Sequence, residues 1–285
     1  MNALLKISKV LLIVIAIPVT MLVAYLGYCW FSAPDYKVAG VPILNYHMVN
    51  DKVFSPLAMT TKDFDRQMKY LHDNGYHTIT LDELYGYIHD GKALPDKPIL
   101  ITFDDGYVDN YTNAWPILKK YGMKATLFMI ADSIGAPRFV NAEQLREMNA
   151  GGFDVQSHTY SHKDMRKLTY AQVQTELTKS KTILSTLLHK PINYIAYPCG
   201  FTNSTVDAET KAAGYRLAVT VTAGNTSPDK NPYALPRLAV FEGDNPFLNF
   251  YMRLHFAEPV RFLWALRDNL RDSGHQTLAA MVPLF

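Results

Sequence analysis

The sequence contains few cysteines and no cluster of basic side chains. Of its 285 residues only two are cysteine, Cys29 and Cys199. Because Cys29 lies in an apolar segment near the N-terminus, a disulfide framework and a zinc site built from thiolates are both excluded. Lys and Arg number 28 against 26 Asp and Glu, and no basic run stands out. A nucleic-acid-binding surface is therefore not expected.

Charged side chains are also missing from one long segment. The stretch from Val10 to Phe31 carries none, and its length of about 22 residues is enough to cross a bilayer as a helix. Lys6 and Lys9 precede it, so the positive-inside rule predicts an N-terminus in the cytoplasm and export of the remainder to the periplasm or cell surface. A cleaved signal peptide or a lipoprotein site at Cys29 is the alternative, but bulky residues flank both candidate processing sites. We predict a cytoplasmic N-terminus over residues 1–9, a transmembrane helix over 10–31 and a linker over 32–40.

Apolar runs and amphipathic stretches alternate about seven times from Val41 to Phe241. This pattern predicts an α/β fold with a parallel sheet and crossover helices, closed or nearly closed into a barrel, with a flat doubly wound sheet as the alternative. The expected strands are Val41–His47, Tyr76–Thr80, Pro98–Phe103, Ala125–Ile130, Phe153–Gln156, Tyr194–Tyr197, Arg216–Val219 and Leu238–Phe241. The expected helices are Thr61–Asn74, Leu81–His89, Tyr111–Tyr121, Ala142–Ala150, Tyr170–Leu188 and Val206–Ala213.

Two adjacent carboxylates end the most apolar of these strands. Asp104 and Asp105 follow the run Ile99–Phe103 and precede Gly106. Carboxylates at the end of a buried strand cost desolvation free energy unless a partner offsets it, and a bound cation is the simplest partner. One Asp can then ligate a metal while the other remains free to move a proton. An ordinary Asp-Asp-Gly turn is the alternative interpretation.

A pair of histidines follows another predicted strand. His158 and His162 are four residues apart, and on one helical turn this spacing would let both imidazoles share a metal. Such a pair alone is a weak signal, since surface and core histidines also occur at this spacing. One Asp with two His gives three ligands and leaves a fourth position for water, which is typical of a catalytic centre. Zn²⁺ fits these ligands best, and Co²⁺, Ni²⁺ and Fe²⁺ are the alternatives.

Together the two motifs resemble the polysaccharide deacetylases of carbohydrate esterase family four, also called the NodB homology domain. The resemblance covers about residues 41–241 and rests on Thr-Phe-Asp-Asp-Gly at 102–106 and on the histidine pair. It implies a distorted (β/α)7-type barrel that forms a catalytic domain over residues 41–241. It also implies that Asp105, His158 and His162 hold the metal, and that Asp104 is the general base that activates a metal-bound water.

The third motif of the family is altered in this chain. The family commonly has Arg-x-Pro-Tyr/Phe-Gly, whereas this chain has Ala196-Tyr197-Pro198-Cys199-Gly200 and lacks the arginine. This variant and the Ile-Leu-x-Tyr-His opening at 43–47 are similar to the subgroup that includes biofilm poly-β-1,6-N-acetylglucosamine deacetylases. That subgroup also has a Leu-Pro-Arg stretch, here residues 235–237. The predicted substrate-binding residues are Tyr107, Tyr197, Pro198 and Gly200.

Two catalytic roles rest on single residues. We predict that Arg237 replaces the missing arginine as the partner of Asp104, with an ordinary surface arginine as the alternative. The family often uses a late histidine as the general acid, but beyond residue 220 only His255 and His275 remain, outside the matched region. His47, at the end of the first predicted strand, is the remaining candidate to protonate the leaving amine or to bind substrate. A structural hydrogen bond is the alternative role for His47.

The last segment, residues 242–285, interleaves aromatic and aliphatic residues with arginines. It predicts an amphipathic helical tail that either lies on a membrane surface or packs its apolar face on the barrel.

Three function classes follow from the sequence. The favoured one is a membrane-anchored, metal-dependent hydrolase that removes N-acetyl groups from an extracytoplasmic N-acetylglucosamine-type polysaccharide. A deacylase of O-acetyl esters or of a lipid-linked sugar amide is the second. A glycan-binding relative without activity is the third, and the presence of every metal ligand disfavours it. An N-acetylated glycan and a membrane are the expected partners.

Overall fold

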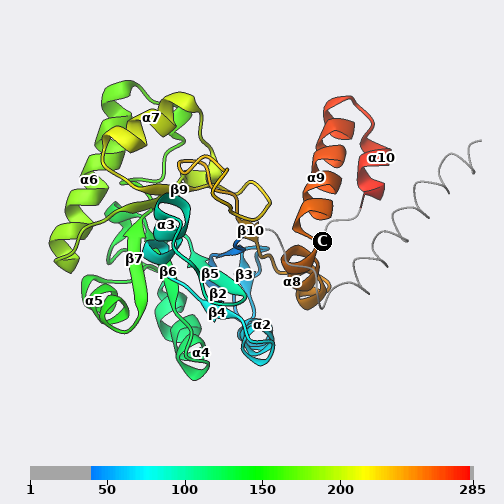
Figure 1. The fold of residues 1–285 in the computed structure, drawn as a ribbon, viewed down its shortest axis with the longest axis horizontal. Helices are drawn as coiled ribbons and strands as arrows, with labels where there is room; N and C mark the ends of the chain where they lie inside the picture. The colour runs from blue at the N-terminus through cyan, green and yellow to red at the C-terminus, as the bar shows by residue number, and fades with distance from the viewer. Residues whose placement is uncertain (1–39, 283–285) are drawn as a thin grey trace, which may run out of the picture. The chain divides into compact units, whose positions relative to one another are not determined.

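The computed structural model describes residues 40–282, and its centre is a sheet of parallel strands surrounded by helices (Figure 1). The transmembrane helix predicted over residues 10–31 lies outside the described residues. Between residues 40 and 282, no helix combines the length and the apolar character needed to cross a membrane.

The main sheet confirms the predicted α/β fold of parallel strands. Seven strands pair in the order β10-β1-β5-β6-β7-β8-β9, every pair is parallel, and β4 pairs with the start of β5. Leu235, which precedes β10, pairs with Val219 of β9, so the two ends of this path meet instead of forming a flat open sheet. The strands are β1 Ile43–Tyr46, β4 His77–Thr78, β5 Pro98–Phe103, β6 Ala125–Met129, β7 Phe153–Ser157, β8 Tyr194–Ala196, β9 Leu217–Val219 and β10 Leu238–Ala239. A separate short pair joins β2 Met48–Val49 to β3 Ala58–Met59.

Helices alternate with these strands, as the sequence predicts. Several begin at a side-chain cap: Thr80 and Asn141 form capping boxes, and Thr60 caps the helix that begins at Thr61. The helices between strands are α2 Thr61–Asp73, α3 Leu81–Asp90, α4 Trp115–Lys120, α5 Ala142–Ala150, α6 Tyr170–Leu188 and α7 Ser204–Ala212.

One predicted helix differs in kind. The sequence predicts an α-helix over Tyr111–Tyr121, whereas the structure has a π-helix over Asn110–Ala114 followed by α4. The Asn110 and Asn113 carboxamides donate hydrogen bonds to the backbone carbonyls of His47 and Val49, each at 2.7 Å. The wider π turn thus accompanies contacts that tie this segment to the end of β1, and π turns are frequent at functional sites.

Two apolar clusters position the site. One lies between the sheet and the outer helices, where Phe64 of α2 packs edge-on against Tyr46 of β1. The other joins strand residues such as Leu100 and Phe128 to Leu81 and Leu84 of α3. Because α3 follows β4 at the amino end of β5, it lies at the opposite end of the strands from their carboxyl ends. The carboxyl ends therefore remain available for polar side chains.

The tail consists of α8 Pro246–His255, α9 Ala257–Asp272 and α10 Gln276–Met281. Helix α8 packs on α2, where Tyr70 meets the rings of Phe247 and Phe250. Helices α9 and α10 lie side by side (Figure 1), and Phe262 on α9 remains 67% exposed. Packing on the barrel thus accounts for α8, while the next two helices keep apolar side chains at the surface.

Candidate active site

The predicted catalytic side chains converge from separate strands. His47 follows β1, Asp104 and Asp105 follow β5, and His158 follows β7. Parallel strands end at one edge of the sheet, so residues far apart in sequence meet there. Arg237 comes from the other direction: it immediately precedes β10, and its fully buried side chain reaches Asp104.

Asp105, His158 and His162 form a compact group. Each offers one ligand atom, and these atoms all lie within 4.8 Å of one another. The Nε2 atoms of His158 and His162 are 3.4 and 3.5 Å from Oδ1 of Asp105. A carboxylate oxygen and two imidazole nitrogens that face one point match the donor set that zinc and similar divalent ions prefer.

The protonation of His158 suits a metal ligand. Its Nδ1 lies 2.8 Å from the carbonyl oxygen of Ala196, which can only accept a hydrogen bond. Nδ1 therefore carries a proton, which leaves Nε2, the ring nitrogen nearer Asp105, as the atom that could bind a metal. A backbone carbonyl in this position fixes both the tautomer and the ring orientation of metal-ligating histidines. The residues present thus fit a divalent cation.

The backbone around this group is held in uncommon conformations. Asp105, Thr159 and His162 have φ values of 73°, 65° and 56°. These values lie in the left-handed region, which residues other than glycine rarely adopt. The helical turn expected for His158–His162 is wrong: the segment is an irregular loop, and the rings meet because the chain folds back. Such conformations persist where surrounding contacts enforce them, and they are frequent at active sites.

Hydroxyl groups and one buried carboxylate hold the histidine loop. Thr159 Oγ1 accepts a hydrogen bond from the backbone N–H of His162 at 3.1 Å. The Glu176 carboxylate of α6 accepts hydrogen bonds from the Ser161 N–H at 2.7 Å and from the Ser161 hydroxyl at 2.5 Å. Glu176 is almost fully buried, so this contact is shielded from solvent. It fixes the residue next to His162.

Asp104 forms a buried ion pair with Arg237. The two guanidinium nitrogens donate to the two carboxylate oxygens at 2.8 and 2.6 Å, and Arg237 also donates to Thr102 Oγ1 and to the carbonyl oxygen of Thr220. Burial alone would raise the pKa of Asp104, but the charges of Arg237 and His158 outweigh it and hold that pKa well below its usual range. Arg237 is therefore not a surface arginine, and Asp104 is ionised at neutral pH.

His47 lies within the electrostatic reach of the same group. Burial lowers the pKa of His47, although the nearby carboxylates of Asp104 and Asp105 oppose this shift. The ring is therefore mostly neutral at pH 7. Its Nδ1 is buried and has no hydrogen-bond partner among the described residues. The structural hydrogen bond considered for this ring is not found at that atom.

The predicted substrate-binding residues are placed differently from one another. Tyr107 is half-buried, its ring stacks on Phe139, and burial together with the Asp105 carboxylate raises the pKa of Tyr107 to about 12. Tyr197 and Pro198 are buried, whereas Gly200 is partly exposed. The Tyr197 hydroxyl lies 3.4 Å from Asp207, so this side chain faces α7.

Sequence reasoning missed the groups that support the site. Glu176 occupies the buried face of α6 together with Val173, Leu177 and Ser180, and a carboxylate at such an apolar position could have identified it. Gly106 was part of the sequence motif, but the reason for its glycine was not foreseen: φ is 93°, and a Cβ there would collide with the side chain of Met129. Asn110 and Asn113 gave no signal, since the π-helix that aims them was not expected.

The Glu176 contact generates a testable prediction. In Glu176→Ala, Ser161 loses both acceptors, so the loop that presents His162 loosens, and we expect zinc affinity to fall about tenfold to a hundredfold. Competition with a chromophoric chelator measures it. Glu176→Gln retains an acceptor and should keep most of the affinity, while Glu143→Ala removes an exposed carboxylate on α5 as a control. Equal affinities for Glu176→Ala and Glu143→Ala would exclude this role.

Comparisons with known proteins agree with this geometry. A sequence profile of the polysaccharide deacetylase family matches residues 91–218. The protein YxkH of Bacillus subtilis, whose name places it among the polysaccharide deacetylases, is 42% identical over 207 residues, which cover 73% of this chain and 74% of YxkH. A poly-beta-1,6-N-acetyl-D-glucosamine N-deacetylase of Staphylococcus aureus is 28% identical over 271 residues, which cover 82% of this chain and 93% of that protein.

Solved structures show the same fold. The deacetylase PplD of Streptococcus pyogenes, in complex with acetate, matches with a TM-score of 0.71 and 30% identity over 78% of this chain and all of PplD. IcaB of Ammonifex degensii matches with a TM-score of 0.67 and 29% identity over 75% of this chain and 97% of IcaB. This chain therefore belongs to the polysaccharide deacetylase family, in its NodB group and similar to the poly-N-acetylglucosamine deacetylases, and is a hydrolase that acts on carbon–nitrogen bonds.

Proposed function

We propose that this enzyme removes N-acetyl groups from an N-acetylglucosamine polysaccharide outside the cytoplasm. The observation that supports the proposal best is the close grouping of Asp105, His158 and His162 beside the ionised Asp104. The Staphylococcus aureus relative, named for N-deacetylation of poly-beta-1,6-N-acetyl-D-glucosamine, supports the substrate class.

The metal proposal rests on the donor set. Asp105, His158 and His162 would hold one divalent ion. Zn²⁺ fits these ligands best, and Co²⁺, Ni²⁺ and Fe²⁺ are the alternatives. Such an ion, when bound, supplies Lewis-acid chemistry, since it acidifies water and polarises a carbonyl group.

The proton transfers belong to the chain's own residues. Asp104 accepts the proton of the attacking water, because Arg237 keeps its carboxylate ionised and oriented. The same pairing makes Asp104 a weak base, so it releases this proton readily to His47, which passes it on to the departing amine. His47, neutral at rest, delivers a proton only after receiving one, or else donates an N–H hydrogen bond to the sugar. A backbone N–H near Tyr107 is the proposed oxyanion donor.

The substrate classes can be separated by one assay. We expect acetate release from N-acetylglucosamine oligomers, loss of activity with a chelator and recovery with zinc. Asp104→Asn should lower kcat about 10²- to 10⁴-fold, the usual contribution of a general base, while Asp229→Asn, on an exposed loop, should match the wild type.

Other outcomes point to the alternatives. Release of acetate from O-acetylated glycans alone would favour an esterase, and hydrolysis of a lipid-linked sugar amide alone would favour that deacylase. Glycan binding without any turnover would leave a non-catalytic relative. Wild-type turnover in Asp104→Asn would contradict the general-base role.

Arg237 generates a prediction about pH. Because Arg237 holds the pKa of Asp104 down, its loss raises that pKa, and the acidic limb of the kcat/KM profile should move to higher pH. For Arg237→Met we expect a shift of at least about one pH unit, and a smaller one for Arg237→Lys, which keeps a positive charge. Far-UV circular dichroism checks that both variants fold. An unshifted acidic limb in folded Arg237→Met would remove Arg237 from the mechanism.

The location outside the cytoplasm rests on the sequence. We propose that residues 10–31 anchor the enzyme as an uncleaved helix, with the catalytic domain over residues 41–241 and the tail over 242–285 on the extracytoplasmic side. The enzyme should then remain in membranes washed with alkaline carbonate, and its intact mass should include residues 1–31. A mature N-terminus beyond residue 31 would show a cleaved signal peptide instead.

A further inference from the structure

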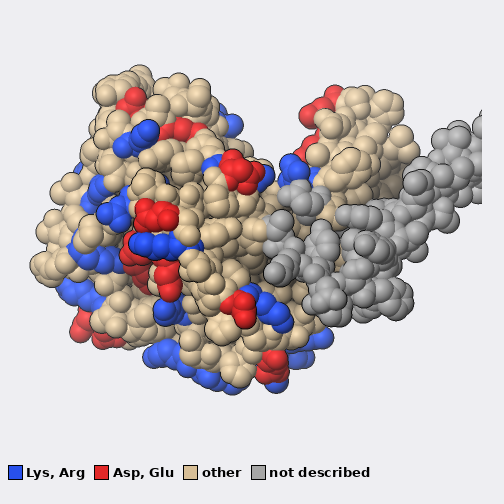
Figure 2. Space-filling view, in the orientation of Figure 1, with Lys and Arg blue, Asp and Glu red and all other residues tan. Residues whose placement is uncertain are grey.

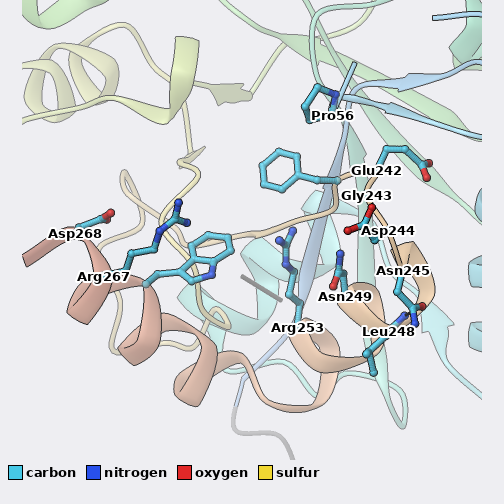
Figure 3. A pocket seen from close by; sticks show the side chains of 12 residues that line it. Pro56, Glu242, Gly243, Asp244, Asn245, Leu248, Asn249, Arg253, Arg267 and Asp268 are labelled. Atoms are coloured by element: carbon cyan, nitrogen blue, oxygen red, sulfur yellow. Dashed lines mark hydrogen bonds between the residues drawn. The ribbon is translucent and has the colours of Figure 1, made fainter. Parts of the chain in front are cut away.

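A recess of about 610 Å³ is lined by none of the residues that the proposed chemistry uses. Its walls are the loop after β10, helix α8 and helix α9. In Figure 3, Arg267 and Asp268 extend from α9 on one side, and Asp244, Asn245 and Asn249 lie on the other. Pockets of this volume accommodate ligands the size of one or two sugar units.

Lys and Arg are interspersed with Asp and Glu over the visible face of the barrel, without a field of one sign (Figure 2).

The strand register places this recess next to His47. Strands β10 and β1 are neighbours, Ala239 is aligned with Asn45, and the N–H of Val240 donates to the carbonyl oxygen of Asn45. Phe241 lies two residues after Ala239, and His47 lies two residues after Asn45. The two residues therefore follow neighbouring strands, and the backbones of neighbouring strands are about 4.8 Å apart. Phe241 lines the recess, so this part of its wall follows the strand next to the one that His47 follows.

The inner wall is aromatic and rigidly held. The Arg253 guanidinium, only 5% exposed, lies 4.9 Å from the ring centroids of both Phe241 and Trp264 and donates to the carbonyl oxygen of Ala239. Both rings remain partly exposed. The Trp264 indole N–H is buried and has no acceptor among the described residues, so a ligand in the recess would meet the ring of Trp264 and not this donor.

The rim has more acidic groups than basic ones, with Glu242, Asp244 and Asp268 against Arg267. Asp244 and Asp268 are exposed, and neither forms an ion pair within residues 40–282. Glu242 is held by the Thr60 N–H at 3.0 Å. Aromatic faces suit the apolar face of a pyranose ring, and carboxylates or amides suit its hydroxyl groups and any ammonium group.

The geometry points to a subsite in this recess for a hexosamine unit of the glycan, one or two sugars from the unit that reacts. This inference rests on the proposed function, because only a polymeric substrate would occupy both places. Substrate would enter the reaction site with its neighbouring sugar stacked on the wall formed by Phe241 and Trp264. The acidic rim would add affinity where that sugar already carries a free amine.

The test compares oligomers of different length. Trp264→Leu keeps an apolar side chain but removes the flat ring. We expect it to raise KM for N-acetylglucosamine pentamers and hexamers about fivefold to tenfold, with kcat and the KM for the dimer unchanged. Phe262→Ala, on the same helix but exposed elsewhere, is the control and should leave every constant unchanged. Equal KM changes for dimer and hexamer, no change at all, or the same effect from Phe262→Ala would overturn the subsite.

Two further experiments distinguish which form of the sugar the subsite binds, and whether the subsite exists if the enzyme proves inactive. If the subsite prefers a free amine, the double variant Asp244→Asn/Asp268→Asn should raise KM for partly deacetylated oligomers only. If the subsite prefers an N-acetyl group, this double variant should match the wild type, while Trp264→Leu still raises KM. Should the wild type release no acetate, the proposed function fails on its own. Calorimetric titration with glucosamine and N-acetylglucosamine hexamers then tests the recess, because binding that Trp264→Leu weakens supports it and binding that Trp264→Leu leaves unchanged overturns it.

Discussion

The ion pair between Asp104 and Arg237 is the interaction on which the site depends. A carboxylate at the end of a buried strand cannot stay charged without compensation, and the bidentate guanidinium supplies it. Breaking such a buried pair costs about 3–5 kcal/mol, because the remaining charge has no partner. The same pair links strands that are distant in sequence, since Arg237 precedes β10 and Asp104 follows β5. Fold stability and the charge state of the proposed base therefore rest on one contact.

Near this pair, strained backbone conformations place the side chains of the site. Asp105 and His162 adopt left-handed conformations, and the contacts of Ser161 with Glu176 and of Thr159 with His162 keep the loop in place. Pre-organisation of this kind lets imidazoles and a carboxylate face one another before a ligand arrives. A recess is lined by the loop after β10 and by α9, and the proposed subsite there would extend the region that a long substrate contacts.

The sequence predicted much of this and failed at identifiable points. Apolar runs identified the parallel strands, because a strand buried on both faces is nearly continuous in Ile, Leu and Val. The Asp pair and the histidine pair were located by residue type and spacing, and Arg237 by a short motif. The spacing of His158 and His162 wrongly predicted a helical turn, since four residues also span a loop that folds back. Glu176 and the π-helix at Asn110–Ala114 depend on tertiary contacts, which local patterns do not encode.

The central claim is that Asp105, His158 and His162 hold one divalent ion. Anomalous diffraction from zinc-loaded crystals, recorded on both sides of the zinc absorption edge, tests it most directly. The account predicts one strong peak per chain at bonding distance, about 2.0–2.2 Å, from a carboxylate oxygen of Asp105 and from Nε2 of both histidines. A zinc peak bound elsewhere on the chain, with none among these three side chains, would contradict it.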